Sequence, residues 1–184
     1  EYAARNGRAK MTSREFLYRS SFILGRHLIG YEVQKILALV DWCSSRNNDD
    51  ASIGVIGWGE GGLLSLYSAA LDERIDAACV SGYFNSRQTM WSEPISRNVY
   101  ALLDQFGDAE LATLIAPRKL VVEAAAGPKL ELAGNGGAPA KLASPLLSAV
   151  SAEMDRAIEL IGAPNLTPFN LIATKDGQGD FGSP

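Results

Sequence analysis

Short apolar runs alternate with helical patterns over most of the chain. Four such runs are typical of buried strands: Ile53–Ile56, Ala77–Ser81, Lys119–Glu123 and Phe169–Ala173. Apolar residues at helical spacing predict helices over Gly61–Leu71, Asn98–Phe106, Ala109–Leu114 and Leu146–Ile161, and the Gly- and Ala-rich residues 127–145 predict a loop. Strands that alternate with helices indicate an α/β fold with a parallel wound sheet and flanking helices.

The first fifty residues break this alternation, because they contain helical patterns and no strand. Thr12 or Ser13 is placed to cap a helix that contains Phe16, and a second apolar helix runs to Cys43. A sheet that starts so late has an incomplete core and an unpaired edge. We therefore expect residues 1–184 to form a single α/β domain that is a segment of a longer chain. The rest of that chain, or another subunit, is the expected partner.

Composition and charge narrow the classes of function. The net charge is −4 with scattered lysines and arginines, whereas nucleic-acid binding requires a clustered basic face. No apolar run approaches the roughly 20 residues of a membrane span. Cys43 and Cys79 are too few for a zinc cluster, His27 is the single histidine, and Asp49 and Asp50 are typical of a turn. We expect no nucleic acid, membrane, metal or cofactor, and the compartment stays open.

The glycine-rich turn "GWGEGG" after the first strand carries the candidate chemistry. Gly57, Gly59 and Gly62 match the G-x-G-x-x-G spacing that lets a pyrophosphate approach the backbone at a helix N-terminus. A dinucleotide site also requires an acid at the end of the next strand, to hold the ribose. That strand ends at Ser81, and none of the four residues that follow is acidic. Nucleotide binding is therefore an alternative that rests on the turn alone.

The same turn satisfies a nucleophile elbow, which needs small residues two before and two after its apex. Gly57 and Gly61 supply them around Gly59, and Gly62 lets the helix pack close to the sheet. "IGVIGWGEGGLLSLYSAALDERIDAACVSGYF" resembles the elbow, helix and next strand of the α/β-hydrolase superfamily, in particular its acetyl xylan esterase and dienelactone hydrolase branch. "GYEVQKILALVDWCSSR" and "DAELATLIAPRKLVVEA" resemble further segments of that branch. The resemblance implies an elbow inside a parallel sheet, not at its edge.

The resemblance also implies a serine at the position of Gly59, an acid after the third strand and a histidine after the fourth. Glycine has no nucleophile. Glu60 stands where a backbone N–H completes an oxyanion hole, and we expect its side chain to form a salt bridge or face solvent. Glu123 ends the third strand, a few residues before the position where the resemblance implies the acid, and is the possible acid. Trp58 either lines a pocket or packs against neighbouring residues. No histidine follows the fourth strand, and His27 precedes the elbow, on the surface or at the cap of an expected helix.

These positions predict an esterase-like domain that lacks its serine and histidine and serves as a scaffold or binding module in a larger protein. One alternative is an active carboxylic-ester hydrolase, similar to acetyl xylan esterases, that uses residues outside this segment. The other is nucleotide binding through Gly57, Gly59 and Gly62.

Overall fold

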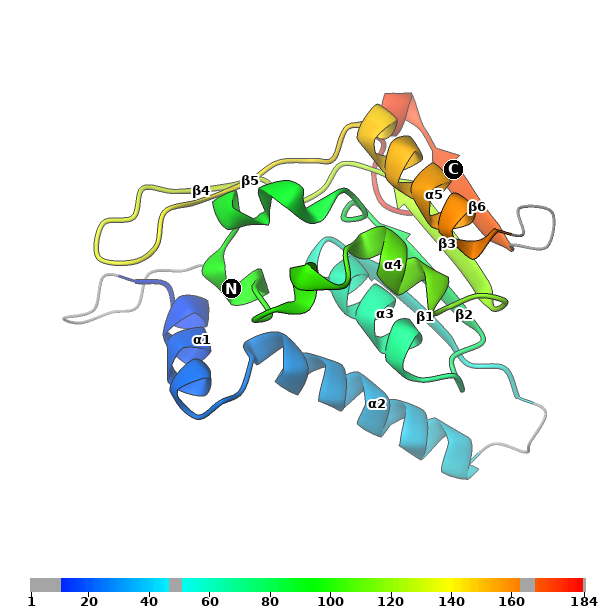
Figure 1. Cartoon of the computed structure of the whole chain (residues 1–184), viewed down its shortest axis with the longest axis horizontal. Helices are drawn as coiled ribbons and strands as arrows, with labels where there is room; N and C mark the ends of the chain where they lie inside the picture. Colours follow the sequence, from blue (N-terminus) through cyan, green and yellow to red (C-terminus); the bar gives the residue numbers. More distant parts are fainter. Residues whose placement is uncertain (1–10, 47–50, 163–167, 184) are drawn as a thin grey trace.

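The computed structural model describes residues 11–46, 51–162 and 168–183. Its central sheet has four parallel strands in the order β1-β2-β3-β6 (Figure 1). They are β1 Gly54–Trp58, β2 Ala77–Ser81, β3 Lys119–Ala124 and β6 Phe169–Ala173. All four predicted strands are present and parallel, so the predicted α/β architecture is confirmed.

Five α-helices accompany the sheet in the described residues, and four short 3-10 helices lie in the connections. The α-helices are α1 Ser13–Ile23, α2 Leu28–Arg46, α3 Glu60–Leu71, α4 Asp108–Thr113 and α5 Leu147–Ile161; the 3-10 helices are Arg87–Ser92, Ile95–Arg97, Leu102–Asp104 and Lys175–Gly177. The Thr12 hydroxyl accepts a hydrogen bond from the Glu15 N–H (3.1 Å), so of the two candidate residues Thr12 caps α1.

Two predicted segments are wrong. The helix expected over Asn98–Phe106 is only a 3-10 turn, because Ala101 adopts a left-handed φ of 62° that interrupts a regular helix. The loop expected over residues 127–145 contains an antiparallel hairpin, β4 Leu130–Leu132 and β5 Ala140–Leu142, which extends away from the main sheet (Figure 1). Three-residue strands are too short to produce a readable alternation.

The core lies between one face of the sheet and the helices α3, α4 and α5, which cover that face (Figure 1). Val80 and Val122 of the strands are fully buried there with Leu63 and Leu66 of α3. The opposite face is covered only in part by the described residues: Ile56 of β1 keeps 66% of its surface exposed, whereas Glu123 of β3 is buried beneath the C-terminal segment. β1 is also an edge strand of the described sheet, as the late first strand predicted.

Candidate functional site

The turn from β1 into α3 has a strained backbone with Gly59 at its apex. Gly59 adopts φ 55° and ψ −114°, a conformation that residues with side chains rarely adopt. Its N–H donates to the carbonyl of Ser81 at the end of β2 (2.9 Å), and its carbonyl accepts from the N–H of Leu63 in α3 (3.1 Å). The apex is therefore fixed both to the neighbouring strand and to the helix that follows.

Close backbone packing explains two of the flanking glycines. A Cβ at Gly57 would overlap the carbonyl group of Gly61, and a Cβ at Gly62 would lie 2.9 Å from the carbonyl oxygen of Ser81. A Cβ at Gly61 itself would meet no atom within 4 Å. The prediction that Gly61 must be small is therefore wrong: its carbonyl, not its α-carbon, is the crowded group.

Pro128, which follows β3, covers the apex of the turn. A Cβ at Gly59 would lie 2.8 Å from Cδ and 3.0 Å from Cγ of the proline ring. The ring thus occupies the space into which a side chain at this position would project. The apex carries no reactive group and has no room for one in this arrangement.

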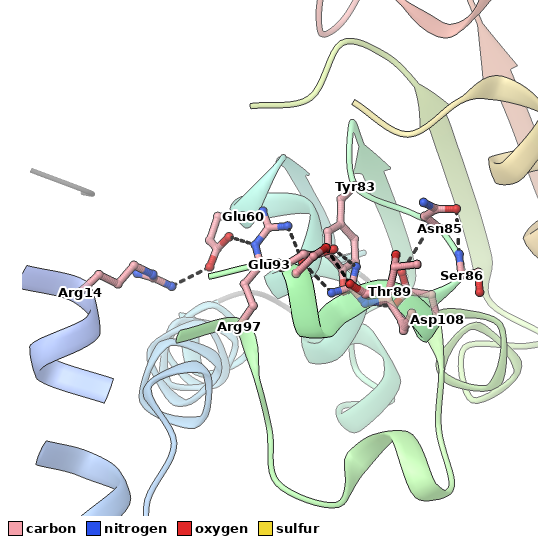
Figure 2. Close-up of polar contacts among 11 residues, drawn as sticks. Arg14, Glu60, Tyr83, Asn85, Ser86, Thr89, Glu93, Arg97 and Asp108 are labelled. Atoms are coloured by element: carbon pink, nitrogen blue, oxygen red, sulfur yellow. Dashed lines mark hydrogen bonds and ion pairs between the residues drawn. The ribbon is translucent and has the colours of Figure 1, made fainter. Parts of the chain in front are cut away.

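Glu60, the residue after the apex, is held by two arginines from distant segments (Figure 2). One carboxylate oxygen accepts from Nη2 of Arg14 in α1 (2.7 Å), and the other accepts from Nε of Arg97 (2.6 Å). Arg14 also forms a bidentate pair with Glu32 of α2. Of the two roles expected for the Glu60 side chain, a salt bridge or exposure to solvent, the structure shows the salt bridge. The carboxylate joins α1 and the 3-10 segment to the elbow.

The chain of ion pairs continues from Arg97 into the core (Figure 2). Arg97 donates to Glu93 (3.0 Å), and Arg87 donates to both oxygens of the same carboxylate (3.0 and 2.8 Å). Burial disfavours the charge on Glu93, but the two arginines outweigh it and hold the pKa of Glu93 below its usual value. The Arg87 guanidinium lies over the ring of Tyr83, 5.0 Å from its centroid.

Asp108, at the first position of α4, is the inner end of this cluster and is fully buried. Its carboxyl accepts from the hydroxyl of Tyr83 (3.1 Å) and from the N–H of Asn85 (3.2 Å). Burial raises the pKa of Asp108 to about 7, although Arg87 and both hydrogen bonds act to lower it; nearby Glu153 adds to the rise. This carboxyl can exchange a proton near neutral pH, but its zero exposure keeps it from contact with a substrate.

A pocket of about 280 Å³ lies beside this cluster, at the carboxyl ends of β2 and β3. Tyr83, Arg87 and Arg97 line one part of it, and Pro128 and Lys141 line another. Lys141 comes from the hairpin that the sequence pattern did not reveal. Ligands of open α/β sheets bind at the carboxyl ends of strands, so this is the candidate ligand site nearest to the elbow.

Trp58, the last residue of β1, packs against a loop. Its indole N–H donates to the carbonyl of Ala126 (2.7 Å), and a Cβ at Gly82 would lie 3.0 Å from the same nitrogen. Of the two roles considered from the sequence, these contacts favour packing. The side chain still exposes 42% of its surface.

Glu123, the candidate acid, is buried on the open face of the sheet. One of its oxygens accepts from the N–H of Gly182 (3.0 Å), and the other has no hydrogen-bond partner among the described residues. Thr174 and the 3-10 helix Lys175–Gly177 follow β6, where the resemblance implies a catalytic histidine. The structure therefore gives Glu123 a backbone partner from the C-terminal segment.

His27 lies in the connection between α1 and α2, directly before Leu28, and its carbonyl accepts from the N–H of Tyr31 (3.3 Å). It is therefore at the start of α2, as a capping histidine would be, and not on a helix surface. Its Nε2 accepts from the N–H of Tyr100 (3.3 Å), and its ring contacts those of Tyr18 and Phe22. These contacts place the imidazole against α1 and the segment that precedes α4. They give it no link to the residues of the elbow.

The described part of the chain contains no group of three or more His, Cys, Asp or Glu residues that could hold a metal ion. None of its helices is long and apolar enough to span a bilayer. Cys43 and Cys79 are half-buried free thiols, and burial, with Glu123 nearby, raises the pKa of Cys79. Asp49 and Asp50 lie outside the described residues.

Neither a protein-family model nor a curated protein matches the chain. Similar solved structures include a candidate acetyl xylan esterase from Bacteroides fragilis, with a TM-score of 0.65 and 13% identity over 89% of this chain and 40% of that one. A methylesterase matches with a TM-score of 0.55 and 18% identity over 84% of this chain and 32% of that one. A glucuronoyl esterase from Caldicellulosiruptor kristjansonii matches with a TM-score of 0.50 and 14% identity, over 82% of this chain and 46% of that one.

The chain has an α/β-hydrolase-like fold. It spans less than half the length of these three solved proteins, so a partial core is consistent with the similarity. The edge position of β1 by itself argues against a hydrolase elbow, which was expected inside the sheet. The structural similarity outweighs that argument, because a chain covering 40% of its neighbour can end its sheet where the neighbour continues.

Proposed function

We propose that this α/β-hydrolase-like domain does not catalyse ester hydrolysis and serves as a scaffold or binding module within a larger protein. The observation that carries the proposal is the apex of the elbow. Gly59 supplies no nucleophile there, and Pro128 occupies the space in front of it. Covalent acyl transfer needs a reactive side chain at this point, as well as room for the acyl group.

The surroundings of the apex support the same proposal. The carboxylate of Glu60 is bound by Arg14 and Arg97, so it is not free to replace the missing nucleophile. His27 is engaged with the backbone of Tyr100, and the chain has no other histidine to act as a base. The serine at the apex of the elbow and a histidine after the fourth strand, two of the three groups of a triad, are therefore both missing.

The similar proteins are esterases, and this chain covers less than half of each of the three compared. We propose that further chain or another subunit completes the sheet beyond β1, and that catalysis, where it occurs, uses residues outside this segment. A nucleotide at the turn is the less supported alternative. Pro128 lies against Gly59, where a pyrophosphate would have to approach the backbone.

Hydrolysis of p-nitrophenyl acetate tests the proposal. We expect the purified chain, the Gly59→Ser variant and the Gly59→Ser/Pro128→Ala double variant to react no faster than the buffer. The double variant matters because it adds the hydroxyl and removes the ring atoms that would crowd it. Circular dichroism confirms that each protein is folded before the assay.

Turnover by the unmodified chain would contradict the proposal and indicate a nucleophile other than residue 59. Turnover that appears only in the Gly59→Ser variants and disappears on His27→Ala would also contradict it. That result would mean that the imidazole reaches the elbow from the connection between α1 and α2.

A further inference from the structure

A second and larger pocket, of about 730 Å³, lies between α2, α3 and the segment that leads into α4. This volume is within the range of small-molecule sites, about 300–1,000 Å³. Its lining is mainly apolar and includes Ile29, Val33, Leu37, Tyr67, Val99 and Leu102. No residue of the elbow contributes to it, so it is a separate site.

The floor of this pocket is well packed and its rim is open. Ile29 and Val33 of α2 and Leu111 of α4 are almost fully buried, whereas Tyr31 and Leu71 at the rim expose 46% and 67% of their surfaces. An apolar hollow of this kind favours a ligand that removes hydrocarbon surface from water.

The basic groups of the pocket lie where the chain enters α2, and Gln34 and two tyrosines supply its other polar groups. Arg26 and His27 line the pocket immediately before that helix begins, and no Asp or Glu lines it. Arg26 is exposed and forms no ion pair with the described residues. His27 accepts a hydrogen bond at Nε2, so its proton is on Nδ1, and this buried nitrogen has no partner among the described residues.

We propose that this pocket binds an apolar carboxylate, with the hydrocarbon chain along α2 and the carboxylate at Arg26 and His27. The guanidinium supplies the charge and a forked donor, which suit a carboxylate. The unpartnered N–H of His27 is the second donor at this end of the pocket. From Leu28 to Leu37 the helix rises about 14 Å, which gives a medium-length chain continuous apolar contact. The inference goes beyond the proposed function and does not depend on it.

Gly30 offers a way to close the pocket without distorting the protein. It lines the pocket in the first turn of α2, and a Cβ there would meet no atom within 4 Å. A Gly30→Leu substitution therefore projects a side chain into free space and also replaces a poor helix former. Loss of binding in this variant cannot be attributed to unfolding if its melting temperature is unchanged or higher.

The test is a titration of the isotope-labelled chain with decanoate, below its micelle concentration, followed by amide chemical shifts in NMR. We expect saturable shifts centred on α2, and loss of binding in Gly30→Leu. Arg26→Gln should weaken decanoate binding about tenfold, the effect of one charge-assisted contact. Decanol, which has the same hydrocarbon chain without the charge, should bind more weakly and should not respond to Arg26→Gln.

Lys35→Gln is the matched control, because it removes a positive charge from the exposed surface of the same helix outside the pocket. We expect it to leave decanoate binding unchanged. Shifts that persist in Gly30→Leu would overturn the site. Equal affinity for decanoate and decanol, or equal losses in Arg26→Gln and Lys35→Gln, would overturn recognition of the carboxylate.

Discussion

Gly59 combines a left-handed φ of 55° with a neighbouring proline ring, so both its backbone and its surroundings favour glycine. We expect Gly59→Ser to lower the free energy of unfolding by about 1–3 kcal/mol, from backbone strain and the contact with Pro128. Urea unfolding measures this change. Gly61→Ser is the control in the same turn, since a Cβ there meets no atom within 4 Å. Equal losses in the two variants would contradict the explanation.

The buried carboxyl of Asp108 links stability to pH. Its pKa is about 7 in the folded chain against an ordinary value of 3.8, so between these values the folded state binds the proton more tightly. The stability that this provides is complete below about pH 4 and is lost as the pH rises through 7. Arg87 and Glu153 act on the same carboxyl with opposite signs and hydrogen bonds from Tyr83 and Asn85 lower its pKa, but burial dominates.

We therefore expect the free energy of unfolding to fall from pH 4.5 to pH 7.5 relative to the Asp108→Asn variant. The amide keeps the size of the side chain and one acceptor but does not titrate in this range. Denaturant unfolding at several pH values gives the difference between the two proteins. Parallel profiles would show that Asp108 has an ordinary pKa in the folded state.

Single residues differ in how well the sequence predicts them. Gly57 and Gly59 belong to a short glycine-rich motif, so the turn and its missing nucleophile can be predicted from residues that are adjacent in the sequence. The cluster of Arg87, Glu93 and Asp108 does not, because its members meet only after the chain has folded. The two arginines and one glutamate between residues 87 and 97 were the available signal, but charge alone does not distinguish a buried pair from a solvated one.

Between elements, Glu153 of α5 binds the start of α4. The carboxylate is buried and accepts from the N–H of Ala109 (3.0 Å), which lies in the first turn of α4 and has no partner within that helix. Glu153→Ala should leave this amide unsatisfied and lower stability by about 1–3 kcal/mol. Denaturant unfolding tests this against Glu159→Ala, an exposed acid on the same helix. Similar small effects in both variants would contradict the role of the contact.

At the scale of elements, length decided what could be predicted. Ala77–Ser81 and Phe169–Ala173 have the predicted bounds, because five consecutive apolar-rich residues between turns give a clear pattern. The strands β4 and β5 have three residues each, and their pairing with one another could not be read from the sequence. The helix predicted over Asn98–Phe106 does not form, because Ala101 adopts a left-handed conformation. The spacing of apolar residues cannot predict that conformation.

Across the whole molecule, the uncovered face of the sheet is the largest departure from ordinary packing. Parallel sheets are normally covered on both faces, and here α3, α4 and α5 cover one. Ile56 and Ile172 expose 66% and 37% of their surfaces on the other face, and Glu123 has an oxygen without a partner among the described residues there. In the proposed longer protein a further segment covers this face and pairs with the edge of β1.

The isolated chain should therefore bury this face by self-association. We expect its sedimentation coefficient to rise with protein concentration and the hydrophobic dye ANS to bind. Ile56→Lys should reduce both effects, because a charged side chain in an edge strand opposes pairing and docking on the same surface. Leu39→Lys is the control, since Leu39 exposes 58% of its surface on α2, away from the sheet. A chain that stays monomeric at all concentrations and binds no dye would contradict an open face, and equal effects of the two lysines would place the association elsewhere.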